Sequence, residues 1–152
     1  FDNINNIIEK KSFKHRNVNT VGKIIKNSNS IGQHIDLILS HELINVDRIK
    51  SANFKIVVDG INSTGGIAVP DLLRKLNVDV IKLNCEPNGN FIHDPEPLEK
   101  NLVELSKFVV KHNADLGIAV DPDVDRLAFI DEIAYSLVLC GVGKEKYRCS
   151  IE

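Results

Sequence analysis

Three aspartates at alternate positions, Asp121, Asp123 and Asp125, are the residues whose types and spacing point most directly to chemistry. They follow an apolar run, and Arg126 comes immediately after them. Residues two apart in an extended segment point the same way, so the three carboxylates can converge on one point. Like charges that close repel one another, and a cation is expected to offset the repulsion. Because oxygen ligands favour a hard cation, the sequence predicts a Mg²⁺ site.

Arg126 adds a second element to this predicted site. Three carboxylates around one divalent ion leave a net negative charge, which the guanidinium can balance. The same guanidinium can hold a phosphate through two parallel hydrogen bonds. Mg²⁺ beside an arginine is a typical arrangement in enzymes of phosphoryl transfer, whose catalysis depends mainly on neutralising the charge of the phosphoryl group. The four residues together therefore favour an enzyme that moves phosphoryl groups.

The aspartates could also belong to a different kind of loop. One alternative is a solvated acidic turn, but such a turn does not require aspartates at strictly alternate positions followed at once by an arginine. An EF-hand also has alternating aspartates, and Glu132 would fall at its last ligand position, but Arg126 stands where that loop needs glycine. A haloacid-dehalogenase-like aspartyl phosphatase is the main alternative, although it continues into a loop and helix where residues 127–130 continue as a strand. A non-catalytic Mg²⁺-binding remnant is the alternative from another class.

The elements that must position these residues alternate between strands and helices. Strands are predicted at 54–59, 78–83, 115–120 and 127–130. Helices are predicted at 67–76 and 98–109, with shorter ones at 31–41 and 46–51 and a short amphipathic one around Ile4, Ile7 and Ile8. Residues 62–66 form a loop that can cap the next helix, and residues 84–97 a longer loop. This order favours an α/β fold with a parallel sheet, in which ligands lie beyond the carboxyl ends of the strands, where Asp121 falls.

Composition sets further limits on fold and partners. Of 152 residues, 43% are hydrophobic and 26% are charged, which suits a folded domain with a sizeable core. The net charge of −2 gives no electrostatic case for nucleic acid or a membrane surface as partner. No apolar run approaches the roughly 18 residues of a membrane-spanning helix. Three widely spaced cysteines indicate reduced thiols and a cytoplasmic location. The chain has no methionine and begins with Phe1, so we expect a fragment of a longer protein.

Four segments, in the same order, resemble the second domain of the α-D-phosphohexomutases, the family of phosphoglucomutase, phosphomannomutase and phosphoglucosamine mutase. They are FKIVVDGINSTGG, CEPNGNFIHDPEPLEKNL, ADLGIAVDPDVDRLAFIDE and, within the last, the loop DPDVDR. Family members usually have glycines between the aspartates, and Pro122 and Val124 resemble a variant of that pattern. The resemblance covers about residues 31–132, and residues 133–152 fit the family's pattern poorly.

The resemblance implies a three-layer α/β/α sandwich with a mixed, mostly parallel sheet, whose last strand at 127–130 runs antiparallel. It implies that residues 1–30 are the tail of the first domain and a linker, and that residues 31–132 are the second domain with the metal loop. Residues 133–152 would be a divergent or truncated segment. Asp121, Asp123 and Asp125 would bind Mg²⁺, and Arg126 would contact the phosphorylated serine or the phosphosugar.

The implied function is the interconversion of hexose 1-phosphates and 6-phosphates through a phosphoserine and a bisphosphate intermediate. The substrate would be a hexose phosphate, bound with the help of the parent's other domains, and the resemblance leans towards phosphoglucosamine mutase or phosphoglucomutase/phosphomannomutase. The serine loop, the sugar-selecting loop and the phosphate-clamping loop of the family are absent from this sequence. The chain alone is therefore expected to be inactive.

Four other features invite a functional interpretation that we do not favour. Asp59 is interpreted as a turn-forming residue, and the Gly65-Gly66 pair as a structural turn rather than a phosphate-binding loop. His93 is interpreted as a loop histidine that hydrogen-bonds nearby backbone or Asp94. Cys85 is interpreted as a packing residue.

Overall fold

The computed structural model describes residues 2–15 and 17–139, and the chain divides into two compact units, Phe1–Ser30 and Ile31–Glu152. The first unit contains helix α1 (Asp2–Glu9) and the 3₁₀ turn η1 (Val18–Thr20). All of its described residues are exposed, so the predicted short helix exists but buries none of its isoleucines. Between residues 2 and 139, Arg16 excepted, no helix combines the length and the apolar character that crossing a membrane requires.

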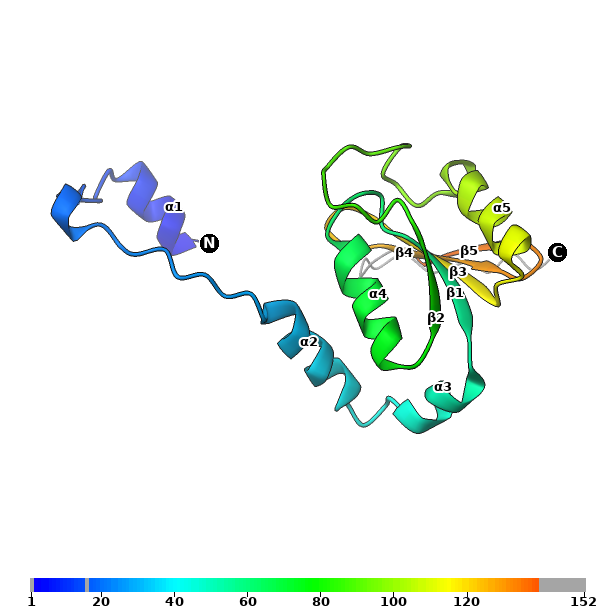
Figure 1. Ribbon diagram of the computed structural model, residues 1–152. Coiled ribbons are helices and arrows are strands. Elements are labelled where there is room, and N and C mark those ends of the chain that lie inside the picture. Colours follow the sequence, from blue (N-terminus) through cyan, green and yellow to red (C-terminus); the bar gives the residue numbers. More distant parts are fainter. Residues whose placement is uncertain (1, 16, 140–152) are drawn as a thin grey trace. The chain divides into compact units, whose positions relative to one another are not determined.

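The second unit is built on one five-stranded sheet with the strand order β2-β1-β3-β4-β5 (Figure 1). Its strands are β1 (Lys55–Asp59), β2 (Asp79–Leu83), β3 (Leu116–Val120), β4 (Leu127–Asp131) and β5 (Ser136–Leu139). β1 runs parallel to β2 and β3, whereas β4 runs antiparallel to β3 and to β5. The predicted mixed sheet with an antiparallel return strand is confirmed, and β5 was not predicted.

Helices cover both faces of the sheet, which confirms the three-layer α/β/α architecture (Figure 1). α5 (Val103–His112) packs over one face, where its Leu105 and Val109 join Val57 and Ile130 of the strands. α4 (Gly65–Lys75) packs over the other, where Leu73 joins side chains that include Ile56, Val58, Ile118 and Val120. Adjacent strand residues face opposite cores, so β1 and β3 are buried on both sides, as their continuous apolar runs predict.

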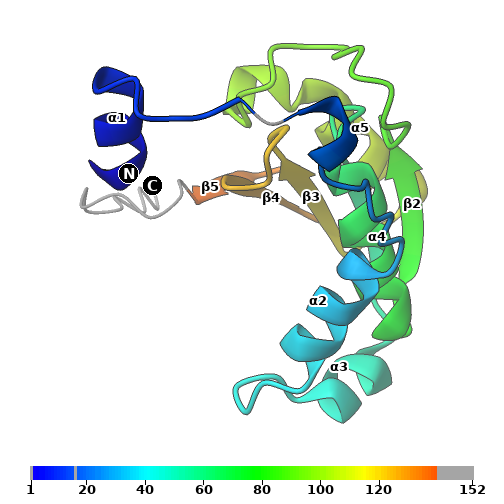
Figure 2. The same cartoon turned by 90° about the vertical axis from the view of Figure 1, so that its left-hand side faces the viewer.

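Two shorter helices extend the layer formed by α4. α2 (Ser30–Leu39) and α3 (Val46–Ala52) lie near the C-terminal end of α4 (Figure 2). Leu39, Val46 and Ile49 pack against the same apolar cluster as Leu73. Both helices were predicted, and α3 begins where Asn45 caps it by accepting a hydrogen bond from the backbone N–H of Arg48 at 2.9 Å.

Two predicted helix starts differ from the structure. The helix expected from Leu98 is divided into a 3₁₀ turn, η2 (Glu99–Asn101), and α5, which leaves Leu98 outside both and 40% exposed. α4 begins at Gly65 rather than at Ile67, so Pro70 lies deeper in the helix than expected. The early start is possible because Gly66 has no Cβ. A Cβ at this position would lie only 2.6 Å from the Cα of Cys85. The glycine lets α4 begin directly against the end of β2.

Candidate functional site

The carboxyl ends of β1, β2 and β3 meet at one edge of the sheet because these strands are parallel. Asp59 ends β1, Asn84 follows β2, and Asp121 follows β3. In open α/β sheets this edge is where ligands bind. Asp59 and Asp121, both singled out in the sequence, therefore lie with Asn84 at the edge of the sheet that favours a functional site.

The structure brings the three predicted aspartates together in the loop between β3 and β4. One carboxylate oxygen from each of Asp121, Asp123 and Asp125 lies within 4.8 Å of the corresponding oxygens of the other two. Asp121 is buried, and Asp123 and Asp125 are exposed. The loop is closed by the pairing of Val120 with Leu127, which are opposite each other in the antiparallel ladder. In the part of the chain that the structure describes, no other group of three His, Cys, Asp or Glu side chains converges in this way.

The carboxylates converge through a turn and not, as predicted, through an extended loop. The backbone N–H of Val124 donates to the carbonyl of Asp121 at 3.1 Å, and Val124 has a left-handed φ of 63°. Asp121 Oδ1 accepts hydrogen bonds from the backbone N–H groups of Asp125 and Arg126, both at 3.1 Å. The chain thus winds around the buried carboxylate of Asp121, and that winding sets the positions of the exposed pair.

Residues from the other side of the sheet edge hold the loop in place. Ser63 Oγ and Thr64 Oγ1 both donate to the carbonyl oxygen of Pro122, at 2.8 and 3.1 Å. Thr64 is the N-cap residue of α4 but makes no capping hydrogen bond with its side chain. The expectation that this segment caps α4 is therefore wrong for the hydroxyl of Thr64. This hydroxyl instead connects the loop after β1 to the aspartate loop.

Arg126 lies between the aspartates and a glutamate that sequence reasoning missed. Its Nη1 is 2.9 Å from Glu96 Oε1, while its Nε is 3.4 Å from Asp121 Oδ2 and 3.7 Å from Asp125 Oδ1. The hydrogen bond to Glu96, with the charges of Glu96, Asp121 and Asp125, raises the pKa of Arg126 and outweighs desolvation. Arg126 is thus a fixed positive charge at the rim of the aspartate cluster.

Crowding of the carboxylates also changes the acidity of Asp125. A side-chain hydrogen bond with Asp121, then desolvation and the negative charges of Asp123 and Asp121, raise the pKa of Asp125 above its usual value. Arg126 opposes this shift. A group of oxygen ligands whose mutual repulsion disfavours full ionisation suits a hard divalent cation such as Mg²⁺, because the cation would relieve that repulsion.

A second polar cluster lies at the same edge, around Asp59, whose exposed fraction is only 1%. Asp59 Oδ1 accepts from the backbone N–H of Ile61 at 3.0 Å, which confirms its predicted function in a turn. The Nδ2 of Asn84 lies 3.3 Å from both carboxylate oxygens of Asp59. His93 Nε2 lies 3.1 Å from Asp59 Oδ2, and His93 Nδ1 lies 2.8 Å from the carbonyl oxygen of Asp94. The backbone contact of His93 was predicted, and its contact with Asp59 was not.

Cys85 has the packing function predicted for it, whereas the glycine pair, predicted as a turn, forms the first two residues of α4. Burial raises the pKa of the Cys85 thiol above its usual value, and its Sγ lies 3.3 and 3.2 Å from the carbonyl oxygens of Val58 and Leu83. Gly65 and Gly66 are buried at the start of α4. Neither feature adds a reactive group to the site.

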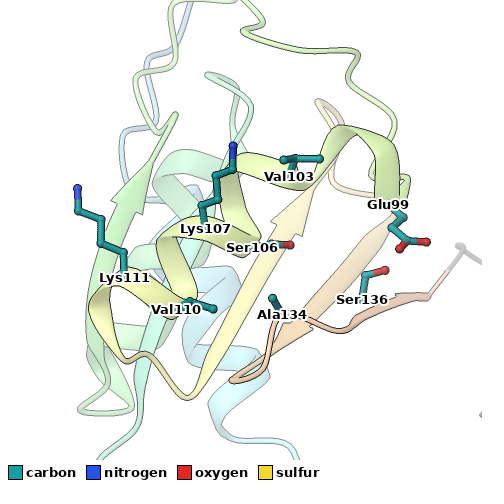
Figure 3. Close-up of a pocket in the computed structure, with 8 residues that line it drawn as sticks. All are labelled: Glu99, Val103, Ser106, Lys107, Val110, Lys111, Ala134 and Ser136. Atoms are coloured by element: carbon teal, nitrogen blue, oxygen red, sulfur yellow. The ribbon is translucent and has the colours of Figure 1, made fainter.

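A separate groove runs beside α5 (Figure 3). Its volume is about 490 Å³, and side chains that include Val103, Lys107 and Val110 line it opposite Ala134 and Ser136. None of the three aspartates lines this groove. The hollow and the cluster of carboxylates are therefore distinct features of the domain.

Comparison with known proteins gives consistent relatives. Residues 32–133 match the model of the family described as phosphoglucomutase/phosphomannomutase, alpha/beta/alpha domain II. A protein of Methanococcoides burtonii named "Probable phosphoglucosamine mutase" is 35% identical over 132 residues, which cover 86% of this chain and 29% of the relative. The phosphoglucomutase/phosphomannomutase of Thermococcus kodakarensis is 36% identical over 123 residues, which cover 80% of this chain and 26% of the relative. The chain thus spans less than a third of the length of these relatives.

Solved structures agree with these sequence relatives. A phosphoglucomutase/phosphomannomutase family protein from Burkholderia thailandensis superposes with a TM-score of 0.53 at 28% identity, covering 60% of this chain and 21% of that one. A phosphomannomutase-like structure from Thermus thermophilus shares the fold, with a TM-score of 0.59 at 18% identity over 71% of this chain and 24% of that one. On the family match, the relatives and the shared fold, the chain belongs to the phosphoglucomutase/phosphomannomutase family and contains its α/β/α domain II.

Proposed function

We propose that this chain is the metal-loop domain of a phosphohexomutase, an intramolecular phosphotransferase that interconverts hexose 1-phosphates and hexose 6-phosphates. The proposal rests above all on the convergence of Asp121, Asp123 and Asp125 at the carboxyl edge of the sheet, with Arg126 beside them. Phosphoryl transfer needs concentrated positive charge at a fixed position, and a cation held by these oxygens beside a guanidinium would supply it. The parent's reaction would pass through a phosphoserine and a bisphosphate, as in the family.

Each residue has a separate part in this proposal. Asp121, Asp123 and Asp125 would hold Mg²⁺, which supplies positive charge to the phosphoryl group when it is bound. Asp121 is the fixed ligand, because two backbone N–H groups already orient its carboxylate. Arg126, 39% exposed and held at one edge by Glu96, keeps N–H donors for a phosphate on the serine or the sugar.

The partners of the domain are part of the same proposal. The substrate would be a hexose phosphate, and the other domains of the parent would supply the serine and the contacts that select the sugar. Relatives named phosphoglucosamine mutase and phosphoglucomutase/phosphomannomutase support this substrate class without deciding between its members. The odd number of cysteines supports a reducing, cytoplasmic location. The proposal includes neither nucleic acid nor a membrane surface as a partner of the domain.

The aspartyl phosphatase alternative is less well supported by the geometry. Its nucleophile would be Asp121, which is 3% exposed and already accepts two backbone hydrogen bonds. The loop after Asp121 leads into β4, an antiparallel strand, and not into a helix. Release of inorganic phosphate from p-nitrophenyl phosphate by the pure chain would support the phosphatase, and Asp121→Asn should then abolish it.

Two activity measurements test the mutase proposal. The pure chain, given a hexose 1-phosphate, the hexose bisphosphate and Mg²⁺, should form no 6-phosphate. The reason is that these 152 residues do not contain the family's phosphoserine loop. A chimera of the Thermococcus kodakarensis enzyme that carries residues 32–133 of this chain in place of its own domain should form it. Asp121→Asn should lower the turnover of the chimera about 100-fold, as loss of one charge-stabilising group does in other enzymes.

Asp79→Asn is the matched control for that substitution. Asp79 is exposed and begins β2, at the opposite edge of the sheet from the aspartate loop. The control should leave the turnover of the chimera unchanged. Isomer formed by the pure chain would refute its expected inactivity, and a chimera equally active with Asp121→Asn would refute the assignment of the aspartates.

A further inference from the structure

The loop of residues 84–97 is attached to the sheet edge at two charged points. His93 reaches down to the buried carboxylate of Asp59, with Nε2 3.1 Å from Oδ2. Glu96, three residues later, reaches across to Arg126, with Oε1 2.9 Å from Nη1. The contact of His93 lies at the end of β1, and the contact of Glu96 lies beside the aspartate loop. The same short segment therefore contacts both polar clusters of the edge.

Both ring nitrogens of His93 face hydrogen-bond acceptors. Nδ1 faces the carbonyl oxygen of Asp94 at 2.8 Å, and Nε2 faces the carboxylate of Asp59. Only the imidazolium form has two N–H donors, so only that form satisfies both contacts. Burial alone would lower the pKa of His93, but the hydrogen bonds to Asp94 and Asp59 and the charges of Asp59 and Glu104 outweigh it and raise the pKa.

Other charged groups also lie around the ring. A cavity of about 520 Å³ between the loop and α5 is lined by His93, Lys100, Glu104 and Lys107. The two lysines oppose protonation of the ring, and Glu104 favours it. Of these charged groups, only the carboxylate of Asp59 is in direct contact with the ring, and it favours the imidazolium together with the carbonyl oxygen of Asp94.

The step from His93 to Glu96 is short and hydrogen-bonded. The backbone N–H of Glu96 donates to Asp94 Oδ1 at 3.2 Å. On the other side, Asn101 Nδ2 donates to the carbonyl oxygen of Glu96 at 2.8 Å. Glu96 is thus fixed from both sides, by the segment that His93 anchors and by the segment that leads into α5.

We propose that His93 is a positioning residue: by holding residues 84–97 against Asp59, it keeps Glu96 in place to orient the guanidinium of Arg126 over the aspartate loop. This inference rests on the proposed function for its effect on catalysis, but the coupling between His93 and Arg126 exists independently of any reaction. When His93 is neutral, one of its two acceptors loses its donor, and the segment that carries Glu96 loosens. The orientation of Arg126 should then depend on the protonation of a residue that it does not touch.

Nuclear magnetic resonance on the full 152-residue chain tests this coupling. The ring Cε1 resonance of His93 and the Cζ resonance of Arg126 are followed between about pH 5.5 and 8.5, around the ordinary histidine pKa. Both should titrate with one midpoint. In His93→Gln, the change at Arg126 should be lost over this range. In Glu96→Gln, His93 should still titrate while Arg126 no longer follows it.

The controls separate coupling from a general response to pH. His34→Gln replaces an exposed histidine of α2 and should leave the shared titration of His93 and Arg126 unchanged. If His93→Gln fails to fold, the unsubstituted chain and Glu96→Gln still decide the matter. An Arg126 resonance that does not change with His93, or that keeps changing in Glu96→Gln, would overturn the inference.

The chimera with the Thermococcus kodakarensis enzyme tests the catalytic consequence. His93→Gln should lower kcat about tenfold with little change in KM, at the low end of losses seen when supporting residues of a site are removed. It should also remove the part of the pH profile of kcat that follows His93. An inactive chimera would count against the proposed function, and the resonance experiment would still decide the coupling. An active chimera that His93→Gln leaves unchanged would overturn the positioning of Arg126 for catalysis.

Discussion

Replacing Asp121 in two ways separates its structural function from its proposed function as a metal ligand. Asp121→Asn keeps an oxygen that can accept from the N–H groups of Asp125 and Arg126, but it removes a charge. Asp121→Ala removes the acceptor as well. Asp121 is 3% exposed, so water cannot fully replace the missing oxygen. The two variants should therefore differ in stability even without a cation.

The magnitude follows from the two hydrogen bonds at 3.1 Å. A hydrogen bond to a charged acceptor contributes about 1.5–3 kcal/mol net, and a neutral one about 0.5–1.5 kcal/mol. Because both N–H groups are only partly buried, Asp121→Ala should lower the free energy of unfolding by about 3 kcal/mol. Asp121→Asn should lower it by about 1 kcal/mol, since it keeps both bonds and relieves repulsion from Asp123.

Urea unfolding followed by circular dichroism, with and without Mg²⁺, measures both functions. Mg²⁺ at about 100 times its dissociation constant should stabilise the natural chain by about 2.7 kcal/mol, and it should stabilise Asp121→Asn far less. Asp79→Asn should respond to Mg²⁺ as the natural chain does. Equal stability of the Ala and Asn variants would refute the argument from hydrogen bonds. Equal stabilisation of Asp121→Asn and the natural chain by Mg²⁺ would refute its assignment as a ligand.

Two further predictions concern the same edge of the sheet. Val124→Gly should raise the free energy of unfolding by about 1 kcal/mol, because a β-branched residue at a φ of 63° is strained and glycine is not. Val124→Ala should give a smaller gain. A glycine variant with a lower free energy of unfolding in urea than the natural chain would contradict the reasoning. The ion pair of His93 with Asp59 should make stability depend on pH: the pKa of His93 is raised on folding, so the pair's full contribution is present below the unfolded pKa of about 6.5 and is lost as the pH rises through the folded pKa. Urea unfolding between pH 6 and about 9 should show this fall in the natural chain and not in His93→Gln, and an identical fall in both would count against it.

The sequence predicted the elements whose evidence is local. The apolar runs at 54–59 and 115–120 identified β1 and β3, because strands buried on both faces need such runs. β5 was missed, since Ser136–Leu139 is short and is a strand through its pairing with β4. The residues 140–152, part of the segment predicted to be divergent, lie outside the described residues.

The candidate site was predictable only in part, for a similar reason. The aspartates lie within five positions of one another, so their spacing is visible in the sequence. Glu96 is 30 positions from Arg126, and Asp59 is 34 from His93. Ser63 is 59 positions from Pro122. Contacts at such separations follow from strand order and loop path, and they leave no periodic trace along the chain.

The pairing of Val120 with Leu127 makes the length of the aspartate loop a constraint on evolution. Inserting or deleting one residue would shift β4 by one position, and Ala128 and Ile130 would leave the core on the α5 side for the opposite face. Exchanging the residues between the aspartates leaves that length intact. Pro122 and Val124 can therefore be exchanged without moving β4, whereas a change in the number of residues between Val120 and Leu127 endangers the register of the sheet.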